Sequence, residues 1–117
     1  MKGLILAIAV LAGATEGRAE EMAPDWQALN SAEIMAALDG RKLVFAGASQ
    51  VFYPSGRTLY DAGSESWGYW RAEDDRYCSQ WPPGLAWDCY RLERAGDGLS
   101  VRFLDAEGRP FVGVYAK

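Results

Sequence analysis

Histidine is absent from the 117-residue chain, and cysteine occurs only twice. Without an imidazole the chain cannot form a Ser-His-Asp triad or a His-ligated zinc site. Basic residues are also few, with 12 Lys and Arg against 16 Asp and Glu, a formal net charge of −4. Because a nucleic-acid binder needs positive charge to offset the phosphates, none is expected here. We expect no nucleic-acid partner, no metal site and no cofactor.

Long apolar runs are lacking as well. The longest, residues 4–12, has nine residues, well short of the roughly 18–20 that a membrane-spanning helix needs. Lys2 precedes it, and small residues follow it with possible cleavage sites after Ala14 and after Ala19. This order is typical of a secretory signal, predicted here as residues 1–19. A short buried helix is the alternative, but charged residues crowd in directly after the run.

Removal of the signal would leave residues 20–117 as one domain in the periplasm or outside the cell. Leu11-Ala12-Gly13 resembles the start of a lipoprotein signal, but Ala14 stands where a lipid-bearing cysteine is needed. We therefore expect no stable membrane anchor after cleavage.

The two cysteines, Cys78 and Cys89, flank ten residues with Pro82-Pro83-Gly84 near the centre, a strong turn signal. An even count in an exported chain favours a disulfide, and strands meeting at this turn would bring the two cysteines opposite each other. A bridge over such a loop contributes about 3 kcal/mol. A redox-active pair is the alternative, but such pairs are usually Cys-x-x-Cys.

One helix is predicted between Asn30 and Gly40. Asn30 is a suitable N-cap, and Glu33 stands where a capping box needs an acidic residue. Leu29 and Ile34 occupy the positions of a hydrophobic staple, and Gly40 is placed to end the helix.

From Lys42 onward the apolar residues alternate with a period of two, which indicates β-strands. The predicted strands are residues 42–46, 50–53, 57–60, 67–72, 76–80, 87–93, 99–104 and 110–115. The short connections permit only hairpins, so the sheet is an antiparallel meander. To protect its edges, we expect it to close into a small lipocalin-like barrel or to form a compact sandwich. Leu99, Val101 and Phe103 share a face of their strand, which we predict to be core.

Aromatic residues gather between positions 67 and 90, around the two cysteines. Some of these rings fill the core of a short-stranded barrel, and others are candidate contacts for an apolar, aromatic or sugar ligand, or for a protein of the cell envelope. Trp81 and Trp87 flank the Pro-Pro-Gly turn and are expected to be the most exposed. The candidate contact residues are Trp67, Trp81, Trp87 and Tyr90.

Acidic residues give a weaker signal. Glu73-Asp74-Asp75 suggests a cation site, but a solvated hairpin turn explains it better because the spacing of a calcium loop is missing. Asp61, Glu65 and Asp88 are the only candidates for carboxylate catalysis, and nothing in the sequence places them at a shared substrate.

Several motifs carry a resemblance. They are Leu38-Asp39-Gly40, Phe52-Tyr53-Pro54-Ser55-Gly56, Gly68-Tyr69-Trp70-Arg71, and the cysteines flanking a tryptophan-containing loop. Over roughly residues 26–103 the chain resembles short exported proteobacterial proteins of unknown function, which implies an envelope location and no known activity. Gly68-Tyr69-Trp70 is also similar to the Gly-x-Trp of lipocalin-type barrels. A looser similarity links the chain to periplasmic metalloprotease inhibitors, but its bridge lies mid-chain and it has no evident inhibitory trunk.

These features together predict a non-catalytic binding or interaction domain of the periplasm. The alternative is an inhibitor of an exported hydrolase such as a protease, acting through the bridged loop or through residues 20–27.

Overall fold

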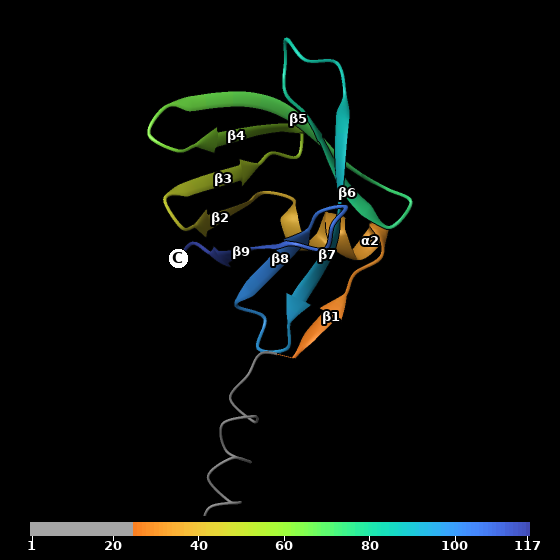
Figure 1. Cartoon of the computed structure of the whole chain (residues 1–117). Coiled ribbons are helices and arrows are strands. Elements are labelled where there is room, and N and C mark those ends of the chain that lie inside the picture. The colour runs from red at the N-terminus through yellow and green to blue at the C-terminus, as the bar shows by residue number, and fades with distance from the viewer. Residues whose placement is uncertain (1–24) are drawn as a thin grey trace, which may run out of the picture.

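The computed structural model describes residues 25–117, so the predicted signal peptide at residues 1–19 lies outside the described part (Figure 1). One helix and nine strands follow in chain order. They are β1 (Trp26–Ala28), α2 (Ser31–Leu38), β2 (Arg41–Phe45), β3 (Ala48–Phe52), β4 (Arg57–Asp61), β5 (Glu65–Glu73), β6 (Arg76–Gln80), β7 (Trp87–Ala95), β8 (Ser100–Leu104) and β9 (Pro110–Tyr115).

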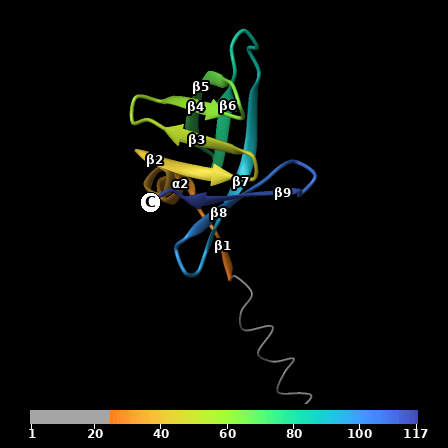
Figure 2. The same cartoon turned by 90° about the vertical axis from the view of Figure 1, so that its left-hand side faces the viewer.

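Strands β2 to β9 form a closed barrel. Each pairs antiparallel with the next, and β9 returns to pair with β2 through Leu43↔Tyr115 and Val44↔Val114. Figures 1 and 2 show the strands curling around a common axis. The predicted antiparallel meander and its closure into a barrel are confirmed, and the sandwich alternative is wrong. Closure leaves none of these eight strands as an open edge.

Strand β1 was not predicted, because three residues are too few to show alternation. It lies along β7 with Trp26 opposite Ala95 and Ala28 opposite Glu93. Strand β6 occupies the other half of β7, from Trp87 to Tyr90. Thus β1 continues the pairing of β7 beyond the place where β6 ends.

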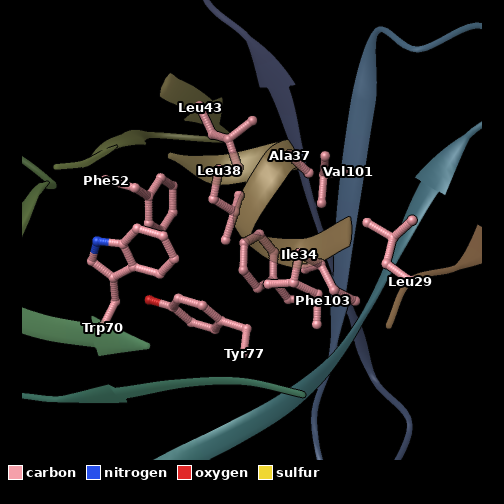
Figure 3. Close-up of a cluster of buried hydrophobic side chains, with 11 residues drawn as sticks. Leu29, Ile34, Ala37, Leu38, Leu43, Phe52, Trp70, Tyr77, Val101 and Phe103 are labelled. Carbon is pink, nitrogen blue, oxygen red and sulfur yellow. The ribbon is translucent and has the colours of Figure 1, made fainter. Parts of the chain in front are cut away.

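Helix α2 closes one end of the barrel. Asn30 caps it as predicted: its side chain accepts a hydrogen bond from the Glu33 N–H at 2.9 Å, and the Glu33 side chain accepts one from the Asn30 N–H at 2.9 Å. The helix buries Ile34, Ala37 and Leu38. These side chains pack with Leu43, Phe52 and Val101 of the barrel wall, as Figure 3 shows. The predicted terminator Gly40 has φ +72°, which favours glycine.

Alternation along the strands divides inner from outer side chains. Val101 and Phe103 are buried as predicted, but the prediction that Leu99 belongs to the core is wrong, since Leu99 is 62% exposed. Strand β8 begins only at Ser100, and the Leu99 N–H instead donates to the Asp97 carboxylate in the preceding turn. The turn, rather than the strand, therefore sets the orientation of Leu99.

The predicted disulfide between Cys78 and Cys89 is confirmed. The two residues lie directly opposite each other on β6 and β7, with their Cα atoms 4.0 Å apart. Cys78 alternates along β6 with Tyr77 and Ser79, which line the cavity, so the bridge lies on the outer side of the wall, where Cys78 is nevertheless fully buried. None of the helices within residues 25–117 has the length and apolar character needed to cross a membrane.

Candidate functional site

The barrel wall forms an open cavity of about 810 Å³, and none of the residues that line it belongs to α2. No charged side chain is among the residues that line it. They are Phe45, Ala46, Gln50, Tyr60, Ser66, Trp67, Tyr77, Ser79, Trp81, Pro82, Tyr90, Phe103, Pro110, Phe111 and Val112. The volume falls in the range of pockets that hold small organic ligands, and the lining is mostly apolar.

The cavity exists because the core fills only one end of the barrel. Next to the helix, the Phe52 ring packs edge-on against Trp70 at 5.7 Å and against Tyr77 at 5.8 Å. The rings of Tyr77 and Phe103 lie 5.1 Å apart. Figure 3 shows these four rings grouped beside α2. Tyr77 and Phe103 belong both to this core and to the cavity lining, so they form its floor.

A short hydrogen-bonded network crosses the floor. The Gln50 amide nitrogen donates to Thr58 Oγ1 at 3.0 Å and to the Tyr77 hydroxyl at 3.1 Å. The Thr58 hydroxyl donates in turn to the Val51 carbonyl at 2.7 Å. Gln50, Thr58 and Tyr77 are all buried, and these bonds hold their side chains in fixed orientations.

Burial raises the pKa of Tyr77 to about 12, although hydrogen bonds with Ser79 and Gln50 act in the opposite direction. Tyr77 is therefore neutral at physiological pH. The floor thus offers hydrogen-bonding groups without a charge.

Trp81 forms one wall of the cavity. Its indole N–H donates to Ser79 Oγ at 3.1 Å, and its ring lies edge-on to Tyr60 at 6.2 Å. A Cβ at Gly68 would lie 2.6 Å from the Trp81 ring, so the glycine is needed for this placement. The expectation that Trp81 is exposed is wrong, since the ring folds back over Gly68 and is half-buried.

Tyr90 belongs to a second wall, with rings from β2, β8 and β9. It lies edge-on to Phe103 at 6.3 Å and to Phe111 at 6.4 Å, and Phe45 contacts Phe103 at 5.8 Å. Burial raises the pKa of Tyr90, and the negative charges of Asp88 and Asp105 add to the effect.

The other two candidates, Trp67 and Trp87, stack on side chains outside the lumen. Trp87 was expected to be exposed, but it is half-buried because the Arg71 guanidinium lies 3.9 Å from its ring centre. Trp67 is 45% exposed, with Arg57 at 4.5 Å and the Tyr53 ring stacked at 5.8 Å. Trp67 borders the cavity, whereas Trp87 is not among the residues that line it.

The acidic candidates lie in or near hairpin turns. Asp61 is directly opposite Glu65 at the β4–β5 turn, and Asp88 is on β7 opposite Ser79. Asp75 binds the start of the helix: its carboxylate accepts from the Ser31 N–H at 2.9 Å, and its own N–H donates to Ser31 Oγ at 2.7 Å. Within residues 25–117, no group of three or more acidic or cysteine residues could hold a metal ion.

No protein-family model, curated protein or solved structure matches this chain. The resemblance to short exported proteobacterial proteins therefore stays a prediction.

The sequence pointed to one residue in each ring wall, Trp81 and Tyr90, but not to the polar floor of the cavity. Gln50 lies two residues before the core residue Phe52, so both side chains share one face of a predicted strand. A glutamine at a core-facing position is unusual and could have marked this residue. The sequence did not indicate that Tyr60, Phe45 and Phe111 line the cavity, because their placement depends on how their strands pair with the neighbouring strands.

Proposed function

We propose that this protein is a non-catalytic binding domain of the periplasm or the extracellular space, and that its barrel lumen holds a small, uncharged, largely apolar ligand. The observation that carries the proposal is the 810 Å³ cavity with aromatic walls and no charged lining residue. A charged ligand would lose its hydration there without gaining an opposite charge.

The character of the lining supports binding rather than catalysis. The hydroxyls of Ser66 and Ser79 and the amide of Gln50 are its polar side chains besides the aromatic ones, and no carboxylate or amine lies beside them in the lining to act as a base. Among the ligand classes considered from the sequence, an aromatic or apolar molecule fits this lining better than a sugar, whose many hydroxyls need more partners. The disulfide and the predicted signal support the exported location.

Titration with the neutral fluorescent probe N-phenyl-1-naphthylamine tests the proposal. Ser66 lies opposite Tyr60 and lines the cavity, so Ser66→Trp places a large ring in the lumen. We expect saturable binding by the wild type and at least tenfold weaker binding by this variant. Ser64→Trp, in the β4–β5 turn and outside the lining, is the matched control and should bind like the wild type. Absence of binding, or equal binding by all three proteins, would contradict the proposal.

A second function, inhibition of an exported protease, is favoured by the connection between β6 and β7, which projects at the top of Figure 1. Leu85 in this connection is 85% exposed, and its carbonyl accepts from the Gln80 amide at 2.8 Å. The disulfide joins the two strands on which the loop is mounted. The loop therefore exposes the apolar side chain of Leu85 between two strands that the disulfide holds together.

Assays of exported proteases with excess protein test this second function. We expect inhibition that Leu85→Asp abolishes and Leu99→Asp, at the exposed leucine of another turn, leaves intact. If none of the proteases is inhibited, or if both variants inhibit as well as the wild type, the loop does not act in this way.

A further inference from the structure

The orientation of the Gln50 amide is fixed by its neighbours. Thr58 uses its hydroxyl hydrogen on the Val51 carbonyl, so toward Gln50 it can only accept. The nitrogen of Gln50 must therefore face Thr58, and its second hydrogen goes to the Tyr77 hydroxyl. Both hydrogens are committed. The group that this side chain can offer a ligand is its carbonyl oxygen, Oε1, an acceptor.

The two ring walls leave a space between them. In the first wall, the Trp81 ring contacts Tyr60. In the second wall, Phe103 contacts both Phe45 and Tyr90, and Tyr90 also contacts Phe111. Among the described ring pairs, none joins Trp81 or Tyr60 to the second wall. A flat aromatic ligand between such walls would gain ring contacts on both faces.

We propose that the ligand is a planar, uncharged aromatic molecule with an N–H or O–H group, which enters with this group leading and donates a hydrogen bond to Gln50 Oε1. This inference rests on the lumen being the binding site proposed above. A donor is required because an acceptor placed against Oε1 would leave two oxygens facing each other without a hydrogen. The cavity volume accommodates a molecule of about two to four rings.

Two probes of matched shape test the inference. 2-Phenylindole carries an N–H, and 2-phenylbenzofuran has an oxygen at the same position. Loss of one hydrogen bond to a buried acceptor corresponds to a tenfold or larger change in affinity. We expect the wild type to bind the indole at least tenfold more tightly, as measured by fluorescence titration or calorimetry.

The variant Gln50→Leu removes Oε1 at nearly constant volume, and we expect it to bind both probes within about twofold of each other. Gln27→Leu, on the exposed strand β1, is the control and should keep the wild-type preference. Gln50→Met repeats the test if thermal melting shows that the leucine variant is unfolded.

Other outcomes separate this inference from the proposed function. Equal binding of the two probes by the wild type would overturn the donor requirement and leave the lumen as a binding site. A preference that persists in both Gln50 variants would overturn the role of Oε1. Binding of neither probe would overturn the inference together with the proposed function.

Discussion

Gly68 determines where the Trp81 indole lies. A Cβ at this position would be 2.6 Å from the Trp81 ring and 2.7 Å from the Gln80 carbonyl, and a backbone oxygen cannot move aside as easily as a side chain. We predict that Gly68→Ala lowers the free energy of unfolding by about 1–3 kcal/mol, the usual cost of overpacking, and displaces the indole from the cavity wall.

Urea unfolding and tryptophan emission would measure both effects of Gly68→Ala. Gly96→Ala is the control, because its Cβ would lie 3.4 Å from the nearest atom and the position has no left-handed φ. A fully stable Gly68→Ala protein with unchanged emission and probe affinity would show that Trp81 does not depend on this glycine.

Tyr77 links the floor of the cavity to stability at alkaline pH. Its pKa is about 12 in the folded protein and near 10 in the unfolded chain, so between these values the unfolded state binds fewer protons and stability falls as pH rises. The contribution of Tyr77 to the free energy of unfolding is fully present below pH 10 and is lost as the pH rises toward 12. We predict that it loses about 1 kcal/mol between pH 9 and 11.

Urea unfolding across this pH range would measure the loss. Tyr90 and Tyr115 also have raised pKa values, mainly because of burial, so the wild-type decline contains their effects too. Tyr77→Phe should therefore show a decline about 1 kcal/mol smaller than that of the wild type. Equal slopes for Tyr77→Phe and the wild type would refute the prediction.

At the scale of elements, the strands and the helix could be predicted because their signals are local. Asn30, Glu33 and Gly40 mark the ends of α2 by capping chemistry, and the glycine-rich turns separate strands that alternate with a period of two. Leu99 shows the limit of this reasoning, because it lies one residue before β8, where the preceding turn and not the alternation of the strand orients its side chain. Trp81 shows a second limit, because the position of its ring depends on Gly68, which lies on β5.

The β6–β7 hairpin carries the disulfide and the loop beyond it. The bridge spans 11 positions, and removing it frees the corresponding loop in the unfolded chain. We predict that replacing both Cys78 and Cys89 with Ala lowers the free energy of unfolding by about 3 kcal/mol. Denaturant titration with and without reductant would check this: reduction should destabilise the wild type by a similar amount and leave the double variant unchanged. A reductant effect on the double variant would point to a different cause.

For the whole molecule, the seam between β2 and β9 is the weakest part of the barrel. Only two residue pairs are in register there, whereas the other neighbouring strands of the barrel share four or five. The Ala116 N–H adds a bond to the Lys42 carbonyl at 3.0 Å, and the Tyr115 hydroxyl donates to the Ala37 carbonyl at 2.8 Å. Transient opening of the barrel should therefore begin at this seam.

A ligand in the lumen would hold this seam together, because Phe45 on β2 and both Phe111 and Val112 on β9 line the cavity. At a concentration 100 times its dissociation constant, a probe should stabilise the fold by about 2.7 kcal/mol. We predict that, in hydrogen exchange followed by NMR, the probe slows the β2 amides that face β9 more than those that face β3. The β3-facing amides of the same strand serve as the internal control. Equal slowing on both sides of β2 would show that the barrel opens as one unit and that the seam has no separate role in admitting a ligand.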